Sequence, residues 1–138
     1  MKKILVGGCF DLIHFGHIDF LTNAKKYGDF LVVALESDES VRRMKGSSRP
    51  IHTQEQRKDM LESLRVVDEV IMLTPLNSDA EYEELVTQVN PSVIAITEGD
   101  PIEIKKRLHA SIVHAEVVII PKVHTPSTSQ LAKLLGLE

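Results

Sequence analysis

Two histidines near the start of the chain have the side-chain type and the spacing needed to bind phosphate. His14 and His17 flank Gly16, and they follow the glycine pair Gly7 and Gly8. Glycine has no Cβ, so it allows a sharp turn and a close approach of the backbone to a ligand. Two imidazoles at the start of a helix can both donate hydrogen bonds to phosphate oxygens, and the free N–H groups of the helix also attract anions. The segment therefore predicts a phosphate site.

Two other interpretations of this histidine pair are open. The residues can be ordinary surface or core histidines, although their glycine-rich surroundings argue against this. A His-x-x-His spacing can also supply two ligands of a zinc ion, but no further cluster of cysteine and histidine completes such a site. Cys9, the single cysteine, need not act as a nucleophile, because phosphoryl transfer depends on positioning and charge neutralisation. We expect no protein-bound metal, and a contribution from the backbone N–H of Cys9.

The elements that must position these residues alternate between strand and helix. Continuous apolar runs predict strands buried on both faces, at residues 3–6, 30–35, 66–73, 93–96 and 117–120. Helical spacing and capping signals predict helices at residues 16–27, 38–44, 53–64, 81–89, 102–109 and 127–135. This alternation is typical of a Rossmann-like α/β fold, with a parallel five-stranded sheet and helices on both faces. Ligands of such sheets bind at the carboxyl ends of the strands, where the strand order reverses.

Composition places the chain among ordinary globular domains. Its 138 residues, 43% hydrophobic and 26% charged, suit a single domain over residues 1–138. A net charge of −4 argues against a nucleic-acid partner. No apolar run approaches the roughly 20 residues of a membrane span, and we expect neither a membrane partner nor a signal peptide. A single cysteine cannot form an internal disulfide, which favours a cytoplasmic protein.

The segment from Cys9 to His17 resembles the cytidylyltransferase-like branch of the nucleotidyltransferases, whose signature is His-x-Gly-His after a first strand. The similarity extends over essentially the whole chain. It implies that His14 and His17 contact a nucleoside triphosphate and stabilise the transition state as an acceptor phosphate attacks the α-phosphorus. It also implies nucleotide contacts from the surrounding residues Gly8, Cys9, Phe10 and Gly16. Mg²⁺ is expected with the nucleotide, because it offsets the triphosphate charge.

A basic cluster follows the second predicted strand and consists of Arg42, Arg43, Lys45 and Arg49. The resemblance implies a catalytic lysine here, and Lys45 is the candidate. Arg49 is suited to bind the phosphate of the acceptor through two parallel hydrogen bonds. The alternative for each of these residues is a solvated surface charge.

Four more residues are predicted to bind the acceptor substrate, and they are Asp11, Arg57, Arg65 and Lys122. For Arg57 a structural ion pair is an equal alternative, with a partner among Asp59, Glu62 and Asp68. Lys122 stands where glycerol-phosphate relatives carry arginine, which removes a bidentate phosphate contact.

Two further segments complete the predicted nucleotide site. The first comprises Glu98, Gly99 and Asp100, and the second comprises Ser127, Thr128 and Ser129. The first follows the fourth strand, where the family has Gly-Asp near the base or the acceptor, and a plain turn is an equal alternative. The second resembles the hydroxyl signature at the start of the last helix, where free N–H groups suit the β- and γ-phosphates. The alternative for the second segment is a simple N-cap.

The resemblance favours a sugar-phosphate adenylyltransferase that uses ATP. Residues 37–46, with Arg49 and Pro50, are most similar to the heptose-phosphate adenylyltransferase domain of lipopolysaccharide precursor synthesis. A glycerol-3-phosphate cytidylyltransferase that uses CTP is one alternative, and an archaeal-type FAD synthetase is another.

A nucleotide-sensing module without turnover is an alternative of a different class. The presence of His14, His17 and Lys45 together argues against it. The resemblance also implies a homodimer, for which no feature of the sequence gives separate support.

Overall fold

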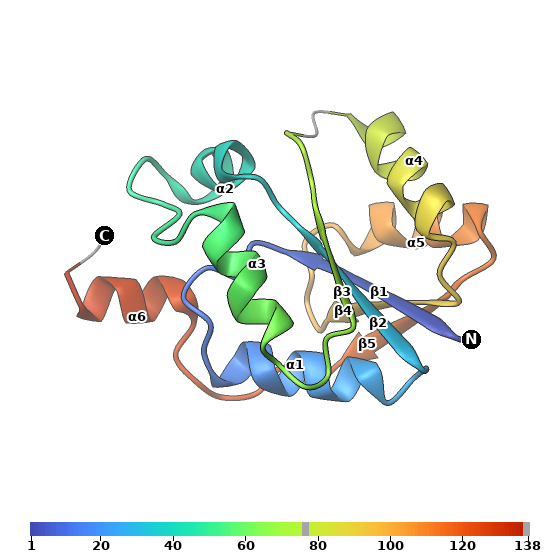
Figure 1. Cartoon of the computed structure of the whole chain (residues 1–138), viewed down its shortest axis with the longest axis horizontal. Coiled ribbons are helices and arrows are strands. Elements are labelled where there is room, and N and C mark those ends of the chain that lie inside the picture. Colours follow the sequence, from blue (N-terminus) through green and yellow to red (C-terminus); the bar gives the residue numbers. More distant parts are fainter. Residues whose placement is uncertain (76–77, 137–138) are drawn as a thin grey trace.

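The centre of the molecule is a parallel sheet, seen in a computed structural model that describes residues 1–75 and 78–136 (Figure 1). Within these residues the strands follow the order β3-β2-β1-β4-β5. They are β1 (Lys3–Gly8), β2 (Phe30–Leu35), β3 (Glu69–Met72), β4 (Val93–Thr97) and β5 (Glu116–Ile120). The order reverses between β1 and β4, which is where a ligand of such a sheet is expected. The predicted Rossmann-like α/β fold is confirmed.

The connecting segments contain the helices that the sequence predicts, with small shifts at their ends. These are α1 (Phe15–Lys25), α2 (Asp38–Lys45), α3 (Gln54–Glu62), α4 (Asp79–Val89), α5 (Glu103–Ile112) and α6 (Thr128–Leu134). Ser37 caps α2, and Thr53 forms the predicted capping box of α3 with Gln56. None of these helices, in the part of the chain described, is both long and apolar enough to cross a membrane.

Two strands, β1 and β3, differ from the prediction by more than one residue. β1 continues through Gly7 and Gly8, which pair with β2, so these glycines do not turn the chain as predicted. The chain turns at Phe10 and Leu12, whose φ angles are 48° and 54°. β3 is shorter than predicted and begins after Asp68, whose carboxylate accepts hydrogen bonds from Lys25 of α1 and from the backbone N–H of Leu31 in β2.

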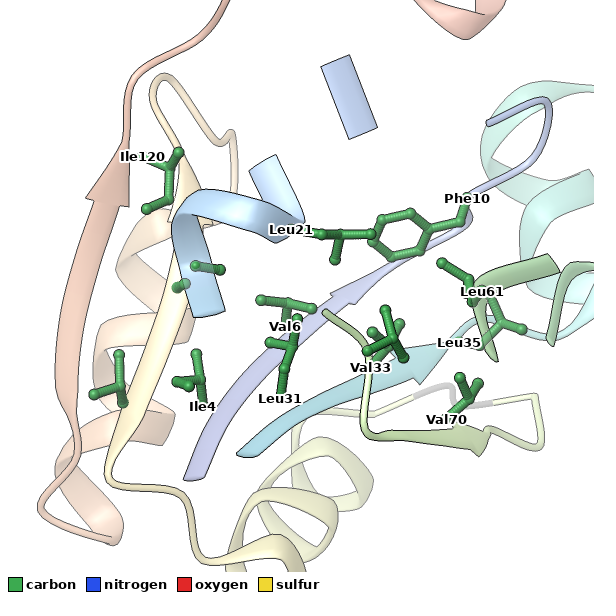
Figure 2. Close-up of a cluster of buried hydrophobic side chains, with 14 of the residues drawn as sticks. Ile4, Val6, Phe10, Leu21, Leu31, Val33, Leu35, Leu61, Val70 and Ile120 are labelled. Atoms are coloured by element: carbon green, nitrogen blue, oxygen red, sulfur yellow. The ribbon is translucent and has the colours of Figure 1, made fainter. Parts of the chain in front are cut away.

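Helices cover both faces of the sheet, and each face has its own hydrophobic core. α1 and α3 pack on one face, and that core includes Ile4, Val6, Phe10, Leu21, Leu31, Val33, Leu35 and Leu61 (Figure 2). α4 and α5 pack on the other face, around Leu5, Val32, Ala34, Val86, Ile94 and Ala110. The strands alternate between the two cores, which is why their sequences are apolar at nearly every position.

Candidate active site

The histidine loop, residues 9–14, connects β1 to α1 at the carboxyl edge of the sheet. His14 is the N-cap of α1, and its Nδ1 accepts the backbone N–H of Gly16 at 3.0 Å. His17 completes the arrangement, since its Nδ1 accepts the backbone N–H of His14 at 3.2 Å. The two imidazoles thus form a capping box of the kind usually made by Ser or Thr with Glu or Gln. Sequence reasoning placed His17 at a helix start but missed this capping role, although the three-residue spacing was its signal.

The two backbone donors determine which nitrogen of each ring carries a proton. Because each Nδ1 accepts a hydrogen bond, the neutral ring must carry its proton on Nε2. Burial, with the nearby His14 and Lys45, lowers the pKa of His17 to about 4. Burial also lowers the pKa of His14. Both rings are therefore neutral at pH 7, and each presents an Nε2–H donor. The ring centroids lie 4.1 Å apart, so the two donors act side by side.

Two glycines leave the space that these rings need. A Cβ at Gly16 would lie 2.7 Å from Cε1 of His14, and a Cβ at Gly8 would lie 2.9 Å from the ring of Phe10. Phe10 itself packs toward Leu21 in the core, and its ring centroid lies 5.3 Å from that of His17 (Figure 2). Its side chain thus supports His17 from the core side.

The histidines line a cavity of about 300 Å³, which we call the first cavity. It lies at the ends of β1 and β4, where the strand order reverses. The predicted site residues that line it are Gly8, Cys9, Phe10, His14, Gly16, His17, Asp100, Lys122 and Ser127. Thr97 at the end of β4 and Val123 in the segment after β5 also line it. The structure therefore brings most of the predicted nucleotide site together around one space.

Lys45 is exposed at the last position of α2. Burial raises the pKa of the Cys9 thiol, and the positive charges of Lys45 and Arg57 oppose that shift. The charge of Lys45 also lowers the pKa of His17, after the larger effect of burial. Lys45 therefore acts electrostatically on the histidine loop from the neighbouring helix, while the Cys9 thiol stays neutral at pH 7.

Asp11 and Arg49 are predicted to bind substrate, but the structure buries both. Nε of Arg49 donates to Oδ2 of Asp11 at 2.8 Å, and their side chains are 1% and 0% exposed. The Asp11 carboxylate also accepts the backbone N–H groups of Ile51 and His52. Burial alone would raise the pKa of Asp11, but these N–H donors and Arg49 hold it below its usual value. The pair has a structural role in place of the predicted substrate contact, because it fastens the segment after α2 to the histidine loop.

Arg57 and Arg65 also depart from the predicted substrate contact. Arg57 is fully buried, and its guanidinium donates to the carboxylate of Asp38 at 2.7 Å and to the backbone carbonyls of Cys9, Glu36 and His52. The structural ion pair considered for Arg57 is present, but with a different partner. Arg65 is exposed between α3 and β3, at the amino edge of the sheet, so it lies on the opposite edge from the histidine loop.

The segment after β4 forms a turn at the carboxyl edge. Gly99 has a φ of 78°, and the N–H of Asp100 donates to the carbonyl of Thr97. The exposed Glu98 accepts the backbone N–H of Lys122 at 3.3 Å, which places these two predicted contacts side by side. Asp100 pairs with Lys106 of α5 at 2.5 Å, and sequence reasoning missed this lysine. The predicted plain turn is present, and it also places Asp100 in the first cavity.

The last helix begins at the first cavity. Ser127 is the N-cap of α6 and forms a capping box with Gln130, so the N-cap alternative holds for this residue. Its side chain also belongs to the lining of the first cavity. The hydroxyl of Thr128 donates to the carbonyl of Leu12 at 3.2 Å, and Ser129 is half-buried beside it. The start of α6 is thereby tied to the histidine loop.

A second cavity, of about 410 Å³, lies on the other face of the sheet, between the strands and the helices α4 and α5. It shares with the first cavity the residues Gly7, Gly8, Cys9, Ala95, Asp100 and Lys106, so the two spaces meet at the ends of β1 and β4. Its walls include the apolar side chains Leu73, Leu85, Val86 and Ile102, and the buried acid Glu36. Sequence reasoning missed this cavity, although an acidic residue directly after a buried strand was a usable signal.

No three histidine, cysteine or acidic side chains among residues 1–75 and 78–136 gather closely enough to hold a metal ion.

The parallel sheet, the His-x-Gly-His loop at the first helix and the match to a family model together define the chain as a nucleotidyltransferase. It belongs to the cytidylyltransferase-like family, whose sequence profile matches residues 5–130. The resemblance inferred from the histidine loop is therefore confirmed.

Two groups of relatives share this domain. FAD synthase of Thermococcus kodakarensis is 39% identical over 136 residues, which cover 96% of this chain and 89% of that protein. Bifunctional protein HldE of Campylobacter concisus is 38% identical over 135 residues, which cover 96% of this chain but only 26% of that protein. The crystal structure of a lipopolysaccharide core biosynthesis protein from Thermoplasma volcanium has a TM-score of 0.70 at 26% identity, over 89% of this chain and 97% of that one.

Proposed function

We propose that the chain transfers a nucleoside monophosphate from a nucleoside triphosphate to a phosphorylated small acceptor and releases pyrophosphate. The observation that carries this proposal is the pair of Nε2–H donors on His14 and His17, held at the start of α1 inside the first cavity. Fixed donors aimed at a phosphate are the main requirement of such chemistry, because negative charge grows on the phosphate oxygens in the transition state.

The transfer is a single displacement between the two cavities. An oxygen of the acceptor phosphate forms a bond to the α-phosphorus, while the bond from that phosphorus to the bridging oxygen of the β-phosphate breaks and pyrophosphate leaves. His14 and His17 hold the triphosphate from the side of α1, where the helix dipole also favours negative charge. Lys45 contributes a mobile positive charge from the side of α2.

ATP is the proposed nucleotide, and flavin mononucleotide is the proposed acceptor. The sequence alone favoured a heptose phosphate. The similarity to FAD synthases over 89% of their length, together with a second cavity walled by apolar side chains, supports the flavin instead. A heptose phosphate is the second candidate, supported by the similarity to the HldE proteins over one part of their length.

The proposal extends to the metal ion, the oligomeric state and the location of the protein. Mg²⁺ enters with the nucleotide and offsets its charge while bound mainly to phosphate oxygens. The protein works as a homodimer in the cytoplasm. Sedimentation of the purified chain with and without ATP tests the dimer, and removal of Mg²⁺ with a chelator tests the metal requirement.

The test of the activity is pyrophosphate release from ATP or CTP, each supplied with flavin mononucleotide, heptose 1-phosphate or glycerol 3-phosphate. We expect release from ATP with one of the first two acceptors, and almost none from the double variant H14A/H17A. H114N is the matched control, since His114 is exposed at the opposite edge of the sheet and asparagine tolerates its φ of 57°. Tight binding of nucleotide without release from any acceptor would show a sensing module and contradict the proposal.

A further inference from the structure

A buried carboxylate in the second cavity has an oxygen without a partner. Glu36 follows β2 directly, and it is 9% exposed. Its Oε1 accepts the hydroxyl of Tyr82 at 2.9 Å. Its Oε2 is buried and has no hydrogen-bond partner among residues 1–75 and 78–136. A buried acceptor of this kind destabilises a folded protein unless an ordered water or a ligand donates to it.

The side chains around Glu36 indicate which kind of ligand could donate a hydrogen bond to its Oε2. Tyr82 and His109 lie nearly parallel, with ring centroids 6.4 Å apart and an interplanar angle of 11°. They line the cavity together with Leu85, Val86 and other apolar side chains. A flat aromatic ring can be buried against such walls with little loss of hydrogen bonds. A sugar with several hydroxyl groups would lose its hydrogen bonds to water without replacement.

The other charged residues of the cavity already have partners. Asp100 pairs with Lys106, and Lys105 pairs with Asp79, whose side chain is largely exposed. The lysines of these pairs, Lys105 and Lys106, can meet the phosphate of a ligand. Glu36 is thus left as the polar group that meets the buried end of the ligand.

We propose that Glu36 determines acceptor specificity by accepting, on Oε2, the ring N–H of a flat heteroaromatic acceptor bound in the second cavity. Tyr82 is a positioning residue, because its hydroxyl occupies Oε1 and leaves Oε2 for the ligand. This inference rests on the proposed function, since the acceptor must lie beside the nucleotide. The isoalloxazine ring of flavin mononucleotide has one such N–H, at N3, between two carbonyl groups.

A binding measurement tests the inference without turnover. Flavin mononucleotide is titrated in the presence of a non-hydrolysable ATP analogue, and quenching of the flavin fluorescence reports the bound fraction. E36Q keeps the size of the side chain but presents an amide where the carboxylate oxygen was. Because a hydrogen bond to a buried charge is stronger than one to a neutral group, we expect the Kd for flavin mononucleotide to be about 10- to 100-fold higher for E36Q. E83Q is the control, because Glu83 is exposed on α4 outside both cavities, and its Kd should equal that of the unaltered chain.

A flavin methylated at N3 separates a direct contact from an indirect one. The unaltered chain should bind this analogue about 10- to 100-fold more weakly than flavin mononucleotide, whereas E36Q should bind the two flavins almost equally. Y82F should weaken flavin binding less than E36Q. The melting temperature of E36Q should not fall, because the substitution removes a buried charge. Equal discrimination against the methylated flavin by both proteins, or a lower melting temperature with unchanged flavin affinity, would overturn the role of Glu36.

The outcomes also separate this inference from the proposed function. Pyrophosphate release with heptose 1-phosphate, but no binding of flavin, would leave nucleotidyl transfer intact and overturn the inference. Flavin binding that depends on Glu36, without pyrophosphate release from ATP or CTP, would support the ligand site and overturn the proposed transfer.

Discussion

The rings of His14 and His17 lie with their centroids 4.1 Å apart, and a backbone N–H group donates to Nδ1 of each ring. The same contacts cap helix α1 and leave both Nε2–H groups for a ligand. The same two side chains therefore stabilise the start of α1 and form the proposed phosphate site. A substitution at either histidine should affect both stability and activity.

Replacement of His17 by alanine removes one proposed phosphate donor and half of the capping box. We expect kcat to fall by about 10²- to 10³-fold, the usual cost of losing a fixed donor to a developing negative charge. The loss of the cap should lower the free energy of unfolding by about 1 kcal/mol, which leaves the protein folded at assay temperature. Steady-state kinetics and urea unfolding measure the two effects, with H114N as the control. Full activity of H17A would contradict the proposed role.

The low pKa of His17 predicts a pH dependence of stability. Its folded-state pKa of about 4 lies below the ordinary value of 6.5, so the unfolded chain takes up the proton first as the pH falls. The free energy of unfolding should therefore decrease from about pH 6.5 downward and level off, for this group, near pH 4. Above pH 6.5 His17 should not contribute to the pH dependence of the free energy of unfolding.

The difference between two proteins isolates this contribution from that of the carboxylates. Urea unfolding of the unaltered chain and of H17A across this range should show a smaller loss of stability in the variant. NMR titration of the imidazole signals gives the pKa directly. A His17 signal that titrates near 6.5 would refute the burial argument.

Asp11 should matter for stability rather than for substrate binding. D11A leaves the guanidinium of Arg49 buried without its carboxylate, and it removes the acceptor of the Ile51 and His52 N–H groups. We expect the free energy of unfolding to fall by about 3 to 5 kcal/mol, as for other broken buried pairs. D59A, at an exposed position of α3, should change it by less than about 0.5 kcal/mol. A stable D11A protein with a raised KM would restore the substrate role.

Lys45 should contribute to turnover through its charge. K45A is expected to lower kcat/KM by about 100-fold, because it removes a positive charge that we propose acts on the transferred phosphate. R42A removes an equal charge from an exposed position one turn earlier on α2, and it should have little effect. Comparison of kcat/KM for the two variants separates a specific contact from the general positive field of this helix. Equal effects would indicate only the field.

The order of the elements and the histidine loop could be predicted from sequence because both depend on local signals. The apolar run from Phe30 to Leu35 forms a strand with the predicted limits, and Thr53 caps α3 as its spacing with Gln56 indicates. His14 and His17 are close in sequence, so their joint position at the start of α1 followed from the strand before them and the helix after them.

The roles of the charged residues could not be predicted, because they depend on contacts between distant segments. Arg49 was predicted from a basic cluster and Arg57 with the wrong ion-pair partners, but each is buried and pairs with a carboxylate in another segment, Asp11 for the first and Asp38 for the second. Arg65 was predicted to bind the acceptor, but it lies at the amino edge of the sheet, opposite the histidine loop. Glu36 was missed for the same reason, since its partner Tyr82 is 46 residues away.

The carboxylate of Asp11, which belongs to the histidine loop, also holds the segment after α2. This contact should decide which parts of the chain can change in length during evolution and which cannot. An insertion between Lys45 and Ile51 would pull on the same carboxylate that supports the histidine loop, so the chemical step would suffer. The parts of the second cavity's wall that α4 and α5 supply lie outside the two segments that this carboxylate holds together. New acceptors should therefore arise by substitutions such as those at Leu85 or Ile102, while the length of the segment before α3 stays constant.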